Sequence, residues 1–280
     1  MIASYSCPPI AVNGLVPSTD GLPGHGFLKK VRRLAGFCLF LLPYAAQAQT
    51  QPPSQPLGTW LIGTVQLPAR ERGWGGFVEG QVRSNALFDQ VNYYEVKGGI
   101  SYDLGPAFSA MVATGRYHTY NFRDLADGPQ VLETRLWEQI TMSQNVERLK
   151  FEHRYRVEQR WFGESTPENQ AIQGRFRNRV RYRMNLMIPL NAMTIQPRTV
   201  FVSIYDELFL NFKAPHLERN RVYAGLGYQI DRNWIIQAGW VNQYDQAPVS
   251  IGDKNNVVLS VMYRLHRKNG ERERLPTQVD

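Results

Sequence analysis

The chain has 280 residues, of which 43% are hydrophobic and 20% are charged, and its formal net charge is +8. Such a basic balance is typical of chains that meet nucleic acid, an anionic membrane surface or anionic solutes. The only two cysteines, Cys7 and Cys38, lie near the N-terminus, which excludes a disulfide framework or a cysteine metal site for most of the chain.

The first 48 residues contain the pattern of an export signal. A basic cluster, a short apolar stretch and an Ala-Gln-Ala motif follow one another over residues 29–48, which is the order of a secretory signal peptide. A Pro/Gly-rich stretch over 1–28 precedes the basic cluster, so we expect translation to begin near Leu28 or Val31. Cleavage after Ala48 leaves 232 residues without cysteine, and export argues against nucleic acid as a partner.

Beyond a short flexible leader at 49–56, the hydrophobicity of the chain alternates with a period of two. The clearest case is 175–188, where every second residue from Arg175 to Arg183 is an arginine and the residues between are mostly apolar. In a strand these arginines share one face, whereas a helix would scatter them around its axis. The candidate strands are 57–66, 74–83, 91–104, 107–120, 130–143, 148–162, 174–188, 193–210, 219–230, 234–244 and 255–265.

The connections between these segments predict two different rims. Tight turns are expected at 103–106, 143–145, 190–192 and 231–233, and longer polar loops at 121–129, 163–172, 211–218 and 245–254. This pattern, with aromatic residues near the strand ends, is typical of an outer-membrane barrel. Because bacterial barrels usually have an even strand number, we expect one of the eleven segments to be misassigned or one to be missing, and 57–66 is the first candidate for such an error.

The fold class that follows is all-β: an antiparallel up-and-down transmembrane β-barrel of ten to twelve strands over 57–266, with a polar tail at 267–280. A soluble periplasmic barrel or sandwich would alternate in the same way, with its apolar face inside. The membrane alternative is favoured because the segments exceed the usual ~5–6 residues of globular strands and the apolar faces end in aromatics. We therefore expect a location in the outer membrane of a Gram-negative bacterium.

Several runs of sequence resemble a known family. They are FEHRYRVEQRW (151–161), RVRYR (179–183), YDELFLN (205–211) and NRVYAGLGY (220–228). Together they resemble the uncharacterised outer-membrane barrels of domain of unknown function 2490, over most of 57–265. The resemblance implies fold and location but no activity or catalytic residues. The chain departs from the family where a polar tail follows Leu265, because such barrels finish at an aromatic terminal strand.

Charged residues on two consecutive segments form the candidate functional strip. If 148–162 and 174–188 pair so that Arg160 faces Arg175, the charged faces of both point into the lumen. Two rows then pair glutamate with arginine and three place arginine opposite arginine, which is unfavourable without counter-charge. The lumen candidates for anion binding are Arg154, Arg156, Arg177, Arg179, Arg181 and Arg183, and the acidic partners are Glu152, Glu158, Asp206 and Glu207.

Three functional interpretations remain open for this strip and for the barrel around it. The arginines are typical of a narrow, porin-like, anion-selective pore, since basic ladders favour anions. Alternatively, arginine and glutamate fill a sealed structural interior. An enzyme that modifies outer-membrane lipid is the less favoured alternative, because no serine, histidine and acid stand at a recognisable spacing. We expect no catalytic residues, metal or cofactor; the expected partners are outer-membrane lipid, small anionic solutes and the barrel assembly machinery.

Overall fold

The computed structural model describes residues 56–69, 72–105, 107–121, 123, 125, 128–163, 175–247 and 250–265. The predicted signal peptide, almost all of the flexible leader and the polar tail lie outside these residues. Over the described ranges the chain contains strands and their connections, and no helix there is long and apolar enough to cross a membrane.

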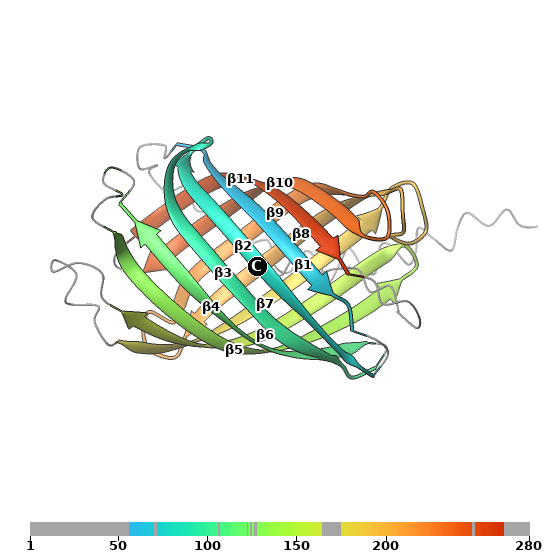
Figure 1. Ribbon diagram of the computed structural model, residues 1–280, viewed down its shortest axis with the longest axis horizontal. Helices are drawn as coiled ribbons and strands as arrows, with labels where there is room; N and C mark the ends of the chain where they lie inside the picture. Colours follow the sequence, from blue (N-terminus) through green and yellow to red (C-terminus); the bar gives the residue numbers. More distant parts are fainter. Residues whose placement is uncertain are drawn as a thin grey trace, which may run out of the picture. The chain divides into compact units, whose positions relative to one another are not determined.

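Eleven strands, wound in chain order, close into one barrel (Figure 1). They are β1 (Gly58–Leu67), β2 (Trp74–Ala86), β3 (Asp89–Asp103), β4 (Phe108–Tyr120), β5 (Pro129–Val146), β6 (Leu149–Gly163), β7 (Phe176–Pro189), β8 (Thr199–Asn211), β9 (Leu217–Gln229), β10 (Trp234–Ala247) and β11 (Ser250–Arg264). Each predicted segment corresponds to one of these strands. The prediction of an all-β barrel of ten to twelve strands is therefore confirmed.

The barrel closes through a parallel pair of strands, as its odd strand number requires. Strands β1 and β11 are parallel, in a register that runs from Gly58 opposite Asn256 to Gln66 opposite Arg264. All other neighbouring strands are antiparallel. An up-and-down chain with an odd number of strands can close only through such a parallel pair. The suspicion against segment 57–66 was thus wrong, because β1 is the strand that completes the barrel.

The rims differ from the predicted connections in three places. The β7–β8 connection spans 190–198 and is not a tight turn, and the tight turn predicted at 143–145 lies within β5, so that the β5–β6 turn is at 147–148. The predicted loop 245–254 is mostly strand, because β10 reaches Ala247 and β11 begins at Ser250. We call the rim with the β1–β2, β3–β4, β5–β6, β7–β8 and β9–β10 connections the turn rim and the opposite one the loop rim. By this definition β1 and β11 both begin at the loop rim and end at the turn rim, so these two neighbouring strands run parallel.

Alternation along the strands gives the barrel a mixed interior and an apolar outer wall. On β3, outward-facing Val96 and Ile100 are about 60% exposed, whereas the inward-facing Glu95 and Lys97 are 3% exposed. The interior is not purely polar, since it also holds three apolar clusters. Their buried members are Trp60, Ile62, Tyr205, Tyr223, Val241 and Val258; Met187, Ile195, Phe201, Ile235 and Met262; and Phe77, Ala113 and Trp137.

Candidate functional site

The predicted charged strip lies inside the barrel, with two exceptions among its members. Arg154, Arg156, Arg179, Arg181 and Arg183 face inward and are 1–2% exposed, as are Glu152, Glu158 and Glu207 at 0–2%. Arg177 is exposed close to the start of β7, at the loop rim. Asp206 is exposed on the outward face, where its carboxylate accepts a hydrogen bond from Asn220 at 2.6 Å. Its assignment as a lumen partner was wrong, because it has the opposite parity to the buried Glu207.

The register of β6 and β7 differs from the predicted one by two residues. Arg160 lies opposite Arg177, Glu158 opposite Arg179, and Glu152 opposite Asn185. A shift of two keeps the same residues in the lumen, since side chains alternate with a period of two. Contacts on the outer face favour the observed register over the predicted one. The observed register places Trp161 opposite Phe176, with ring centroids 5.3 Å apart, and Tyr155 opposite Tyr182. Aromatic cross-strand pairs of this kind stabilise a sheet.

Glu158 is the centre of the network and resolves the predicted arginine repulsion. One carboxylate oxygen accepts hydrogen bonds from Arg179 Nε at 2.9 Å and Nη2 at 2.5 Å. The other accepts from Arg181 Nη1 at 2.8 Å, and Arg156 Nη1 lies 3.5 Å from it. A single buried carboxylate thus holds three guanidiniums from two strands. Such charge-assisted bonds are stronger than neutral ones and fix the planar groups in place.

Glu207 on β8 supplies the second counter-charge, as the sequence had suggested. Its Oε1 accepts hydrogen bonds from Arg154 Nη2 at 2.5 Å and from Arg181 Nε at 2.9 Å, and Arg183 lies opposite it in the β7–β8 register. Arg181 therefore bridges Glu158 and Glu207. The rows of facing arginines persist in this structure, and acidic groups from neighbouring strands offset their repulsion.

Two further acids extend the network toward the loop rim. Arg179 donates from Nη1 to Glu218 at 2.6 Å, and Arg160 donates to the same carboxylate at 3.2 Å. Arg160 also pairs with Glu133 on β5, which in turn holds Arg135 at 2.7 Å. The strip predicted from the sequence did not include Glu218. Nothing in the pattern of β9 alone indicates that Glu218 reaches arginines on β6 and β7.

An aromatic ring completes the packing of the guanidiniums. Phe209 on β8 is 1% exposed, and the guanidinium carbons of four arginines lie within 6 Å of its ring centroid. They are Arg179 at 5.0 Å, Arg181 at 4.4 Å, Arg219 at 5.6 Å and Arg221 at 4.8 Å. The negative face of an aromatic ring attracts cations, most strongly where water is excluded. Phe209 therefore adds to the counter-charge that the glutamates supply.

A second buried network lies on β2 and β3 and was not predicted. Lys97 Nζ lies 2.8 Å from Glu79 and 2.6 Å from Glu95, and all three side chains are at most 1% exposed. Arg83 approaches Glu95 at 3.5 Å and covers the ring of Trp60, with its guanidinium carbon 3.9 Å from the centroid. The alternating Glu79-x-Gln81-x-Arg83 and Glu95-x-Lys97 patterns were signals that could have identified it.

These networks limit the chemistry that the interior can perform. The arginine side chains that β6 and β7 bury are paired with protein carboxylates, stacked on rings or both, so an incoming anion would have to displace them. Among the described residues, no group of three or more His, Cys, Asp or Glu side chains could hold a metal ion. His153 lies on the outer wall, where its Nδ1 and the Tyr182 hydroxyl are 2.9 Å apart. The geometry favours a structural interior.

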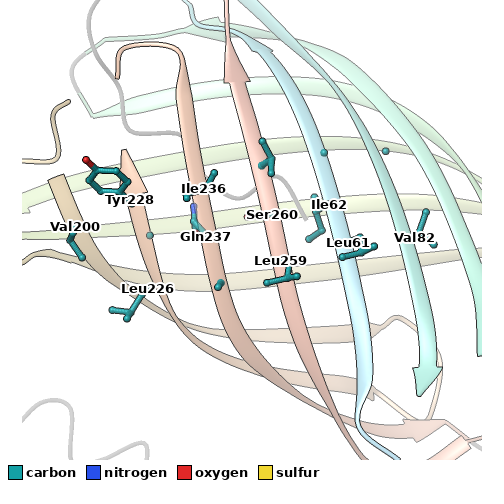
Figure 2. Close-up of a pocket in the computed structure, with 15 residues that line it drawn as sticks. Leu61, Ile62, Val82, Val200, Leu226, Tyr228, Ile236, Gln237, Leu259 and Ser260 are labelled. Atoms are coloured by element: carbon teal, nitrogen blue, oxygen red, sulfur yellow. The ribbon is translucent and has the colours of Figure 1, made fainter. Parts of the chain in front are cut away.

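Two hollows lie on the outer wall among the described residues. The larger, about 780 Å³, crosses the β1–β11 seam and is lined by residues of β8 to β11, β1 and β2, almost all apolar (Figure 2). It exists in part because Gly63 and Gly80 face each other there, and nothing lies within 4 Å of a Cβ added to either. The smaller, about 450 Å³, lies on the wall formed by β2 to β7, and Glu138 is among the residues that line it.

Comparison with known proteins identifies a family but no activity. A family model described as "Protein of unknown function (DUF2490)" matches residues 57–256, which is most of the chain. No curated protein matches the sequence. The matched range begins just before β1 and ends within β11, so it covers nearly the whole barrel.

Proposed function

We propose that this chain, which belongs to the DUF2490 family of proteins of unknown function, is an outer-membrane β-barrel with an interior sealed by ion pairs. The observation that carries the proposal is the burial of the charged strip. Arg154, Arg179 and Glu158 are 0–1% exposed although they face the inside of the barrel. A water-filled channel beside them would leave their surfaces accessible. Side chains that fill a narrow barrel close it instead.

The outer wall supports the membrane location. A soluble monomer rarely exposes a large contiguous apolar surface, yet this wall carries exposed valines, leucines and isoleucines on strand after strand. Aromatic pairs lie near both rims: Trp74 with Tyr102 at 5.0 Å near the turn rim, and Tyr94 with Tyr120 at 5.6 Å near the loop rim. On β3, Tyr94 and Tyr102 are eight residues apart, or ~26 Å along the strand and ~20 Å after a ~40° tilt. This is close to the ~25 Å apolar band of outer-membrane barrels.

The anion-selective pore is the competing function, and the geometry supports it less well. A selective pore presents cationic groups to passing ions. Here Arg181 bridges two glutamates, and Arg179 is held by Glu158 and Glu218. Conduction along this face would therefore require ion pairs to open in a medium where an unpaired charge is costly.

Fluorescence quenching by brominated lipid tests the membrane location. Two variants would each keep a single tryptophan, either Trp161, which is 44% exposed on the outer wall, or Trp137, which is buried inside. In bilayers we expect the lipid bromines to quench Trp161 strongly and Trp137 weakly. Equal quenching of both, or no quenching of Trp161 in a folded barrel, would overturn the membrane location.

Conductance in a planar bilayer under a salt gradient tests the seal. We expect the folded wild-type barrel to insert without discrete openings. Anion-selective openings would refute the seal and favour the arginine-lined pore. In that case the double variant Arg179→Ala with Arg181→Ala tests whether these two arginines set the selectivity. A changed reversal potential would assign the selectivity to them, and an unchanged one would exclude them.

A further inference from the structure

The outer wall carries a carboxylate in the middle of an apolar strand face. Glu138 on β5 points outward and is exposed, with nine residues before it and eight after it in the strand. Its direct neighbours across the sheet are Val112 on β4 and Val157 on β6. The outward residues next to it along β5, Leu136 and Ile140, are also apolar and exposed. Glu138 is therefore an isolated charge on an apolar surface.

Glu138 is one of the residues that line the smaller of the two hollows described above. The hollow has a volume of about 450 Å³, within the range of small-molecule sites. Its walls are aromatic and aliphatic, with Tyr155 and Val157 on β6 and Val180 on β7. It extends to Trp74 and Tyr102, whose rings are in contact near the turn rim. The hollow thus joins an apolar slot to one acidic group.

Glu138 is the only acidic residue among those that line the hollow. The Gln159 amide is the one polar partner of Glu138 among the described residues, and its Nε2 donates to Glu138 Oε2 at 3.0 Å. This partner is a neutral amide, so no cationic group pairs with Glu138 among the described residues. The carboxylate has further acceptor capacity, so it favours a ligand that donates charge-assisted hydrogen bonds.

The proposed membrane location makes this arrangement significant, and the inference rests on that location. A charged side chain that faces lipid is costly, and ionisable residues at such positions mark functional sites with a partner. The larger hollow at the β1–β11 seam has no charged residue in its lining, so acyl chains alone would fill it. At Glu138 the unmet requirement is a cationic donor.

We propose that the Glu138 hollow binds a cationic amphiphile, namely a molecule with an ammonium group and a single apolar chain. The ammonium donates to the Glu138 carboxylate, and the apolar chain lies along the aliphatic and aromatic walls toward Trp74 and Tyr102. Aromatic rings near the bound cation add to the attraction. A hollow of about 450 Å³ fits one chain better than the broad, flat contact of a protein partner.

Binding of n-decylamine to the folded full barrel in phosphatidylcholine nanodiscs tests this proposal, with n-decanol as the uncharged probe and empty nanodiscs as the background. Glu138→Gln keeps the size of the side chain and removes its charge. Asp206→Asn is the matched control, because Asp206 is also an outward carboxylate bonded to an amide but lies outside the hollow. Ala110→Phe fills the hollow from β4 and leaves Glu138 in place.

We expect Glu138→Gln to weaken decylamine binding about 10- to 100-fold, the loss typical of a charge-assisted hydrogen bond. Ala110→Phe should weaken decylamine and decanol alike, and Asp206→Asn should change neither. Equal decylamine binding by wild type and both hollow variants would overturn the proposal. Failure of the wild type to insert into nanodiscs would instead refute the membrane location itself. Self-association that depends on Glu138, without amine binding, would assign the hollow to a protein partner.

Discussion

The substitution Glu158→Gln is the most direct test of the interior network. The side chain is 0% exposed and accepts three hydrogen bonds from Arg179 and Arg181. Glutamine has nearly the same size, so the substitution removes charge without opening a cavity. The variant has a single amide oxygen to accept hydrogen bonds from the guanidiniums, in place of the two carboxylate oxygens of the wild type.

The expected cost follows from the burial of the arginines that remain. Removing one partner of a buried ion pair costs about 3–5 kcal/mol, because the remaining charge stays buried without compensation. Arg179 retains Glu218 and Arg181 retains Glu207, so the loss is partly offset. We therefore expect Glu158→Gln to lower the free energy of unfolding by about 3 kcal/mol, at the lower end of that range.

Urea unfolding of the barrel in lipid vesicles measures this change, followed by tryptophan fluorescence and by the mobility of folded and unfolded forms on gels. Glu147→Gln is the control, since it removes an exposed carboxylate at the β5–β6 turn and should shift stability by no more than about 0.5 kcal/mol. Combining Glu158→Gln with Arg179→Met should give a non-additive effect of about 1–3 kcal/mol. A loss below about 1 kcal/mol for Glu158→Gln would refute the reasoning, because the network would then be hydrated or already broken.

Three further predictions concern separate parts of the barrel and use the same unfolding assay. Lys97→Met leaves two buried glutamates without their shared cation and should cost about 3–5 kcal/mol; a neutral result would mean that water reaches them. Phe209→Leu removes the ring under four guanidiniums and should cost about 2 kcal/mol or more, because the cation–π contacts are lost together with three buried carbons; a cost below about 1 kcal/mol would mean that the ring does not hold the guanidiniums. A Cβ at Gly239 would lie 2.6 Å from the Tyr223 ring, so Gly239→Ala should cost about 1–3 kcal/mol, while Gly63→Ala, with open space around it, should stay within about 0.5 kcal/mol.

Local patterning in the sequence was sufficient to predict the strands and their two faces. Arg179 and Arg181 were assigned to one face and Val180 and Tyr182 to the other, because strand side chains alternate with a period of two whatever the neighbouring strand does. The same parity, applied to the adjacent pair Asp206 and Glu207, admits only one of them to the lumen. The sequence alone did not show which of the two faces inward. The structure shows that Tyr205 and Phe209 are buried in the lumen, so Glu207, which lies between them at the same alternation, faces the lumen too.

Contacts between strands required the tertiary structure. The β6–β7 register depends on which aromatic residues meet on the outer wall, and a slip of two residues leaves the pattern of each strand unchanged. The role of Glu218 depends on barrel closure, which brings β9 within reach of arginines on β6 and β7. The parallel β1–β11 seam likewise follows from the odd strand count and not from any feature of either strand.

The sequence by itself determined the alternation, the strand positions and the polarity of the two faces, because these depend on neighbouring residues in the chain. Only the tertiary structure decided that the arginines are neutralised by glutamates, that the barrel closes through a parallel pair, and that Glu138 stands in a hollow of the outer wall. The physical reason is range: hydrophobic patterning acts within one strand, whereas ion pairs and hollows form between residues that only the closed barrel brings together.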